Sequence, residues 1–227
     1  MLRLLLVLIL GALMIVRPED LPPAYAPWAP LDLRDEPNLF TRLKVLRTAQ
    51  SAPLCQATLR DGVGAAPAVP DFVHSNQCHI RNAVRPRQFS EARMAPERMQ
   101  CSIALRLAMW ERHVLQPAAR RHLGTEVAEI THFGAYACRA MRTSRGISRR
   151  MSQHATGNAF DISGFVLTDG RRISLLRHWN GDGPKAAFLR VARDGLCDWF
   201  RVVLSPDYNA LHADHFHVDQ GPFLSCR

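Results

Sequence analysis

The chain is predicted to fold as an α+β domain. Segments with the two-residue alternation of strands and segments with helical spacing both occur, but they do not alternate regularly along the chain. This order favours α+β over a doubly wound parallel sheet. The 227 residues are 47% hydrophobic and 22% charged, which is ordinary globular composition and excludes wholesale disorder, collagen and a polytopic membrane protein.

The N-terminal segment predicts export. Met1-Leu2-Arg3 precedes an apolar run over residues 4–16, and a helix of that length spans about 20 Å, less than the hydrocarbon core of a bilayer. Residues 1–17 are therefore predicted to be an apolar helix acting as a signal peptide or short signal-anchor. The small-residue site Ala24-Tyr25-Ala26 lies well past the run among prolines, which favours an uncleaved anchor. Residues 18–38 are expected to form a stiff, extended linker before the domain at 39–227.

Export changes the interpretation of the cysteines. There are six, widely spaced and with no C-x-x-C pair, so a thiolate zinc site is disfavoured. In an oxidising compartment the expectation is three disulfides. Six cysteines allow 15 pairings, and the sequence does not choose among them.

The first elements of the domain are a helix and two strands. Residues 99–122 carry apolar residues at helical spacing with charged residues between them, which predicts an amphipathic helix ending at Gly124. Residues 127–133 are expected to form a strand. Residues 158–167 are expected to form another, on which Phe160 and Ile162 face one way and Asp161 and Ser163 the other.

The second half of the domain continues with a hairpin, a helix and two strands. Asp169-Gly170 predicts a tight turn into a strand at 172–176. Pro184 is a favourable first residue for a helix that runs to Trp199. Its buried face is expected to hold Phe188, Val191, Leu196 and Trp199. Residues 200–204 and 215–220 are expected to form the last two strands.

Two polar motifs indicate where the chemistry lies. One is Ser152-Gln-His154-Ala-Thr-Gly-Asn-Ala-Phe-Asp161, and the other contains three histidines in His212-Ala-Asp214-His215-Phe-His217. In an extended strand His215 and His217 point to the same face, with Asp219 next along it. Either motif alone is a weak signal, but the two together on elements that can neighbour one another are much stronger.

The residue types in these motifs predict a zinc site. Two imidazoles and one carboxylate are usual ligands of a catalytic zinc that keeps its fourth position for water. Imidazole nitrogens disfavour Mg²⁺ and Ca²⁺, which prefer oxygen shells. The predicted ligands are His154, Asp161 and His217. Asp214, His215 and His212 are then expected beside that water, where one of them acts as general base or stabilises charge on the attacked carbonyl.

The same motifs carry a family resemblance. S-x-H-x-x-G-x-A-x-D followed by H-x-H resembles the zinc peptidase superfamily of D-Ala-D-Ala carboxypeptidases, lysostaphin-type and murein endopeptidases and the hedgehog signalling domain. Within it, residues 40–227 resemble the bacterial extensin-like C-terminal domain family, through the Tyr136-Ala-Cys138-Arg139 segment, the Ser152-to-Asp161 motif and the closing Asp-His-Phe-His-Val-Asp. The resemblance implies a small antiparallel sheet flanked by helices, with zinc at one edge and the ligand set named above.

The resemblance also implies roles for further residues. Arg139 stands where the carboxypeptidase branch has an arginine that holds substrate, and Ser152 and Tyr136 are expected to contact substrate. The general base stays open between two residues. The carboxypeptidase branch has Glu where this chain has the shorter Asp214, whereas the H-x-H branch has a histidine where this chain has His215.

The net charge of +9 arises from 27 Arg against 2 Lys, a bias that reflects genome composition as much as phosphate binding. No acidic residue occurs between His132 and Phe160, where five arginines lead into the first motif: Arg139, Arg142, Arg145, Arg149 and Arg150. Such a stretch is either a solvated loop or attracts an acidic substrate. Nucleic acid is disfavoured, because no aromatic residues interleave the arginines and no DNA or RNA motif is present.

The sequence therefore predicts a monomeric periplasmic zinc peptidase, tethered to the inner membrane, that hydrolyses peptidoglycan peptides. The alternative is a zinc-stabilised wall-binding module without turnover. A third hypothesis is a polyanion-binding protein driven by the arginines, which predicts steep salt dependence and no effect of a chelator.

Overall fold

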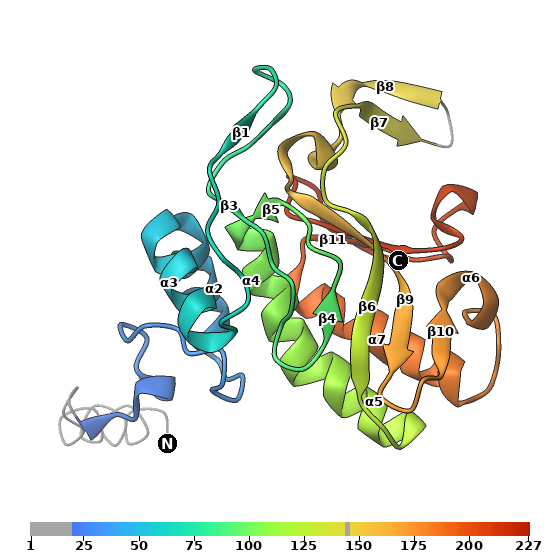
Figure 1. Cartoon of the computed structure of the whole chain (residues 1–227), viewed down its shortest axis with the longest axis horizontal. Helices are drawn as coiled ribbons and strands as arrows, with labels where there is room; N and C mark the ends of the chain where they lie inside the picture. Colours follow the sequence, from blue (N-terminus) through green and yellow to red (C-terminus); the bar gives the residue numbers. More distant parts are fainter. Residues whose placement is uncertain (1–19, 144–145) are drawn as a thin grey trace, which may run out of the picture.

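Figure 1 shows the computed structural model, which describes residues 20–143 and 146–227. The α+β class is confirmed, since one main sheet, three small two-stranded sheets and several helices make up this part of the chain. The predicted apolar helix at residues 1–17 lies outside the described residues. Among the residues that are described, no helix has both the length and the apolarity needed to cross a bilayer.

The elements of the first half are the following: η2 (Pro23–Tyr25), α2 (Thr41–Gln50), α3 (Ala52–Gly62), β1 (Phe72–Val73), β2 (His79–Ile80), β3 (Ala83–Val84), β4 (Arg93–Met94), β5 (Met99–Gln100), α4 (Cys101–Trp110), the π-helical turn η3 (Glu111–Leu115) and α5 (Gln116–Leu123). Those of the second half are the following: β6 (Val127–Gly134), β7 (Ala140–Thr143), β8 (Gly146–Met151), η4 (Gln153–Thr156), β9 (Ala159–Leu167), β10 (Arg172–Ser174), α6 (Leu175–His178), α7 (Pro184–Trp199), β11 (Val202–Leu204), η5 (Ala210–His212), β12 (Phe216–Asp219) and β13 (Ser225–Cys226).

The main sheet has seven strands in the order β13-β11-β12-β9-β6-β4, with β10 also paired to β9. Its interior pairs are antiparallel, but β4 pairs with β6 and β11 with β13 in parallel. The expectation of an antiparallel sheet is therefore correct for the interior and wrong at the two edges. The parallel pair β4–β6 arises because the helices from α4 to α5 connect these strands as a crossover.

One face of the sheet is covered by α4, α5 and α7 (Figure 1). Trp110 of α4 and Phe188 of α7 both pack against Phe165 of β9, with ring centroids 6.3 and 5.3 Å apart. The Trp110 indole also donates a hydrogen bond to the Ala192 carbonyl at 2.9 Å, which fixes α4 against α7. This layer leaves the opposite face of β9 and β12 free for polar side chains.

The helix predicted at 99–122 is present but differs in two ways. It is interrupted by the π-helical turn η3, and every residue of α4 except Ser102 is buried, so α4 is not amphipathic. Arg106 and Glu111, charged residues of the predicted solvent face, are buried. The helix α4 is covered because it packs against the sheet, α7 and α3. The spacing of residues within one helix does not reveal such contacts. The predicted stop at Gly124 is confirmed, with φ of +69°.

The second half follows the predicted boundaries closely. The strand at 158–167 appears as β9 with the predicted alternation up to Ser163, and the hairpin partner ends at Ser174 rather than Leu176 because α6 begins at Leu175. The helix α7 has the predicted bounds, but Val191 is exposed, and Leu189 and Ala192 are buried in its place. The strand predicted at 200–204 begins two residues later, as β11, and ends as predicted. The strand predicted at 215–220 is one residue shorter at each end, as β12.

Three disulfides are present, as predicted: Cys55–Cys101, Cys78–Cys138 and Cys197–Cys226. The first joins α3 to the start of α4, and the third joins α7 to β13. The second joins the short β1–β2 region to the segment that follows β6, which lies beside the predicted metal ligands. Each closes a loop of tens of residues, and such bridges typically contribute about 2–4 kcal/mol to stability.

The proline-rich segment contacts the domain within its described part. Ala26, Leu31 and Leu33 are buried, and the Lys44 ammonium donates to the Pro23 carbonyl at 2.6 Å. Residues 26–33 thus pack on the domain rather than project from it as an extended spacer.

Candidate metal centre

Two neighbouring strands bring together the first two candidate ligands. In the antiparallel pair β9–β12, Asp161 lies directly opposite His217. Their neighbours Phe160, Ile162 and Phe216 are buried in the core, so the strand alternation turns both polar side chains to the open face. His217 Nδ1 lies 2.9 Å from Asp161 Oδ1. Asp161 and His217 therefore lie side by side on the open face of the sheet.

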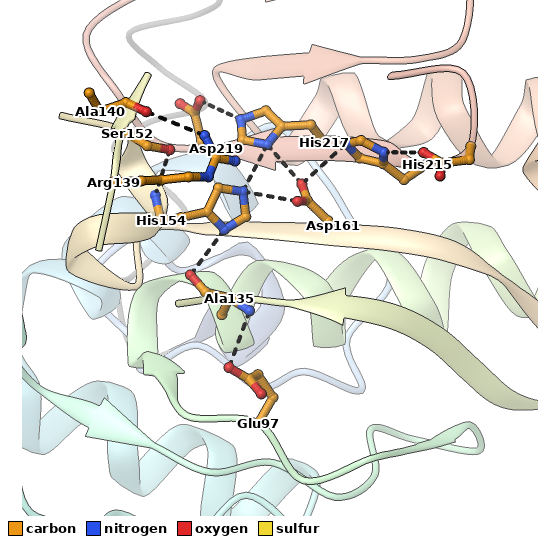
Figure 2. Close-up of polar contacts among 11 residues, drawn as sticks. Glu97, Ala135, Arg139, Ala140, Ser152, His154, Asp161, His215, His217 and Asp219 are labelled. Carbon is orange, nitrogen blue, oxygen red and sulfur yellow. Dashed lines mark hydrogen bonds and ion pairs between the residues drawn. The ribbon is translucent and has the colours of Figure 1, made fainter. Parts of the chain in front are cut away.

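The third candidate ligand, His154, is held by a short 3-10 turn, η4. Ser152 caps this turn, because its Oγ accepts a hydrogen bond from the His154 backbone N–H at 3.3 Å. Gly157 ends it with φ of +62°, a left-handed conformation that explains the glycine in the motif. His154 is 3% exposed, and its Nε2 lies 3.2 Å from both Asp161 Oδ2 and His217 Nδ1. Figure 2 shows the three side chains converging.

Partners outside the cluster orient both imidazoles. His154 Nδ1 lies 3.2 Å from the Ala135 carbonyl, which only accepts, so Nδ1 carries a proton and Nε2 is the nitrogen that faces the cluster. His217 Nε2 lies 2.9 Å from Asp219 Oδ2, so Nδ1 is the nitrogen that faces inward. Carboxylate or carbonyl partners on the outer nitrogen are typical of metal-binding histidines.

The donor set fits a divalent metal. One atom each from His154, Asp161 and His217 lies within 4.8 Å of the other two. Ligands about 2.0–2.2 Å from a tetrahedral zinc are about 3.3–3.6 Å from one another, close to the spacings of 2.9–3.2 Å seen here. Two imidazoles with one carboxylate suit zinc better than Mg²⁺ or Ca²⁺. The ligand role remains a prediction, and the geometry is compatible with it.

Without a metal, the cluster is held by charge. Burial acts to raise the pKa of Asp161, but hydrogen bonds from His154 and His217 outweigh it and hold that pKa well below its usual range. Burial acts to lower the pKa of His217, but its bonds to Asp161 and Asp219 outweigh it and raise that pKa to about 9. The proton on His217 thus stands in for part of the charge that a cation would supply.

The two candidate bases occupy different positions. His215 lies on the cluster side, with Nε2 3.7 Å from Asp161 Oδ1. Its Nδ1 lies 2.8 Å from Asp214 Oδ1, so Asp214 contacts the side of the His215 ring opposite to the nitrogen that faces Asp161. The structure places His215 at the cluster and Asp214 behind it.

His212 lies slightly further out. Its ring centroid is 5.2 Å from that of His215 and 5.9 Å from that of His217. Burial is the main cause that lowers the pKa of His212 to about 4, and the charges of His217 and His215 add to it. A neutral His212 at pH 7 is positioned to offer a hydrogen bond rather than a charge.

The three remaining site residues differ in their distance from the cluster. Figure 2 shows the Arg139 guanidinium on the side of the cluster formed by His154 and Asp219. Ser152 is buried, and its hydroxyl caps η4. Tyr136 points elsewhere: it packs edge-on against Phe72, with centroids 5.1 Å apart, and lines a separate cavity of about 350 Å³.

The basic stretch forms a two-stranded arm, β7–β8, that carries Arg142, Arg149 and Arg150. Arg145 lies outside the described residues. Arg150 stacks on the Phe223 ring, with its guanidinium carbon 5.6 Å from the centroid. The arm begins directly after Arg139 and ends directly before Ser152, so its base adjoins the cluster and its exposed arginines extend from there.

Sequence reasoning missed the residues that support the ligands from outside. Asp219 could have been assigned, since it lies two residues after His217 on the same strand face. Ala135 offers only its backbone carbonyl, and Glu97 supports it by accepting from the Ala135 N–H at 3.3 Å (Figure 2). No spacing in the sequence connects Glu97 with the motif at 152–161, so that support was not predictable.

The family model described as extensin-like protein C-terminus matches residues 53–227. That range includes every residue of the cluster and all of its outer-shell partners. Neither the comparison with curated proteins nor the comparison with solved structures found a match.

Proposed function

Since this chain belongs to the extensin-like protein C-terminus family, we propose that it is an exported zinc-dependent hydrolase that cleaves amide bonds in peptidoglycan peptides. The observation that carries the proposal is the juxtaposition of the cluster formed by His154, Asp161 and His217 with the His215–Asp214 pair. The resemblance of these motifs to the zinc peptidase superfamily, given above, supplies the reaction class.

In this proposal His154 Nε2, Asp161 and His217 Nδ1 hold the zinc, and Ala135 and Asp219 orient the two rings. When bound, zinc supplies Lewis acidity toward a water molecule and toward the scissile carbonyl. A holoprotein would no longer need the proton that His217 carries in the metal-free cluster.

His215 is proposed as the general base. Its Nε2 faces the cluster and its Nδ1 is bonded to Asp214 at 2.8 Å, which leaves the Nε2 lone pair to accept a proton from the attacking water. Asp214 then stabilises the imidazolium that forms. The same Nε2 can pass the proton to the leaving amine when the C–N bond breaks, so the protons balance over the cycle.

Arg139 is proposed to bind substrate from the opposite side of the cluster. Its guanidinium offers several N–H donors in a fixed plane, which suits a carboxylate or the oxygen of an attacked carbonyl. Ser152 acts on the reaction only through the position of His154, because its hydroxyl already caps η4.

The proposed location is the periplasm, with the N-terminal segment as a tether to the inner membrane. Three disulfides within the described residues agree with an oxidising compartment. The arginine-bearing arm beside the site agrees with an acidic polymer as substrate, since stem peptides carry free carboxylates.

Metal analysis combined with digestion of purified peptidoglycan tests the proposal. We expect about one zinc per chain, release of muropeptide fragments, and loss of both in His154→Ala and His217→Ala. His215→Gln should keep the zinc and lower the rate by about 10²–10⁴-fold. His122→Ala, on α5 across the sheet, is the control and should change neither.

The outcomes separate the alternatives. Stoichiometric zinc in both ligand variants would contradict the ligand assignment. Intact zinc with binding to sacculi but no cleavage product would favour the non-catalytic wall-binding module. Binding that depends steeply on salt and ignores chelator would favour the polyanion-binding hypothesis.

A further inference from the structure

A second polar feature lies on the open face of the sheet beyond His215. It is a cavity of about 240 Å³. Its walls come from β6, β9, β10, α6 and the residue before His215, and the polar side chains among them are Thr131, Ser163, Arg172, Ser174, Arg177 and Asp214. The site proposed above uses none of these except Asp214.

The two arginines of this cavity find no partner in the described part of the chain. Arg172 and Arg177 are exposed, and across residues 20–143 and 146–227 neither guanidinium forms a hydrogen bond or an ion pair. Their neighbour Arg171 shows the contrast, because it is paired with Asp169 at 2.7 Å and is also bonded to the Leu123 carbonyl. The lining therefore carries two free guanidinium groups against one carboxylate, that of Asp214, which already contacts His215.

The rest of the lining also suits an anionic group on a peptide. The Ser163 hydroxyl donates to Thr131 Oγ1 at 3.1 Å, which leaves the Thr131 hydroxyl proton free to donate to a ligand. Phe133 gives one wall an apolar surface and meets the His215 ring edge-on, with centroids 5.7 Å apart. The cavity thus lies beside His215, because Phe133 and Asp214 both line it and contact that ring.

The distance from the cluster fixes which part of a substrate would reach the cavity. Ser163 follows Asp161 by two residues on the same face of β9, which corresponds to about 6.6–6.8 Å along the strand. An extended peptide advances by a similar length over two residues. A group in the cavity would therefore belong to a residue about two positions from the scissile bond.

We propose that this cavity is a carboxylate-binding subsite, in which Arg172 and Arg177 hold an acidic group of the peptide about two residues from the bond that is cleaved. The inference rests on the proposed function for the position of that bond, but the binding of the carboxylate itself requires no turnover. The group is either a C-terminal carboxylate or an acidic side chain, since both present the same two oxygens to a guanidinium.

The test compares three peptides on the full-length protein, both zinc-loaded and after chelator treatment. The first is an N-acetylated D-alanine tripeptide with a free C-terminus, the second is its C-terminal amide, and the third is the amide with D-glutamate at the middle position. Calorimetry measures binding, and chromatography measures cleavage. The variants are Arg172→Gln and Arg177→Gln, with Arg121→Gln on α5 as a control that removes the same charge across the sheet.

We expect the first or the third peptide to bind at least about tenfold more tightly than the neutral amide, because a charge-assisted hydrogen bond is worth that factor or more. Arg172→Gln and Arg177→Gln should each remove most of this preference, in loaded and in chelator-treated protein, and Arg121→Gln should keep it. Which of the two acidic peptides is preferred identifies the source of the carboxylate.

Two results separate failure of the subsite from failure of the proposed function. If zinc-dependent cleavage occurs but neither binding nor rate depends on the carboxylate or on the two arginines, the subsite is wrong and the hydrolase stands. If carboxylate binding depends on Arg172 and Arg177 but no peptide or sacculus is cleaved, the subsite stands and the hydrolase is wrong.

Discussion

Two buried carboxylates in this domain have opposite kinds of surroundings. Glu111, fully buried in the π-helical turn η3, accepts hydrogen bonds from the backbone N–H groups of residues 90–92 and from the Gln116 side chain. Asp161, on the open face of β9, is surrounded by imidazoles instead, those of His154, His217 and His215. Both carboxylates are satisfied, but only one is satisfied by groups that can also bind a metal.

The partners of the two carboxylates differ in whether they can also bind a metal. A backbone N–H can only donate, so the Glu111 carboxylate and these N–H groups tie the loop at 90–92 to the helix. An imidazole that loses a proton presents a lone pair, so His154 and His217 can turn from partners of Asp161 into ligands beside it. Burial alone therefore does not identify a functional carboxylate, whereas the type of its partners does.

The strongest test of this comparison is Glu111→Gln. The amide replaces one acceptor oxygen with a donor that faces other donors, so buried N–H groups lose their partner. We expect the free energy of unfolding to fall by about 3–5 kcal/mol, the range for removing one partner from a buried charged pair, with zinc content per folded molecule unchanged. Urea denaturation measures it, and Glu129→Gln, at an exposed position of β6, is the control. If folded Glu111→Gln loses zinc, Glu111 also affects metal binding, and the two carboxylates do not differ in the way described above.

The second test is the pH dependence of the metal-free protein. The pKa of His217 is raised from 6.5 to about 9, so the native state holds this proton more tightly than the unfolded chain does. This contribution is fully present below pH 6.5 and is lost as the pH rises through about 9, a change on the order of 3 kcal/mol. Urea denaturation in chelator between these limits measures it, and the slope should vanish in His217→Gln. A stability that rises over this interval would contradict the charge-held cluster.

The third test concerns the outer shell. Asp219→Asn keeps the oxygen that accepts from the Gly221 N–H but places an amide group where His217 Nε2 needs an acceptor. We expect zinc affinity to fall by about 10–100-fold, as is typical when an outer-shell partner of a ligand is removed. Competition with a chromogenic chelator measures the affinity, and Asp182→Asn, at an exposed position, should leave it unchanged. Equal affinities in the two variants would mean that Asp219 does not orient a ligand.

The smallest effect is expected from the cap of η4. Ser152→Ala removes the acceptor for the His154 backbone N–H and should lower the free energy of unfolding by about 1 kcal/mol. Ser152→Thr retains a hydroxyl and should restore most of that loss. If both variants keep full stability but lose peptide binding, Ser152 contacts substrate as the sequence predicted, rather than only holding His154.

The sequence alone determined the features that depend on local periodicity. Strand alternation placed Asp161 and His217 on polar faces, and both strands were located within one or two residues. The composition of the two motifs predicted which residues converge, and the even number of cysteines predicted three disulfides. These features follow from backbone geometry and side-chain chemistry over a few residues, so they can be predicted without knowledge of the fold.

The tertiary structure decided everything that depends on which segments meet. It selected one of 15 cysteine pairings, buried the apparently amphipathic α4, and placed His215 rather than Asp214 at the cluster. It also brought Glu97 and Ala135 beneath His154, and Arg172 of β10 and Arg177 of α6 to the cavity that Asp214 lines. The physical reason is that such contacts depend on the path of the chain between distant segments, and a linear pattern of residues does not specify that path.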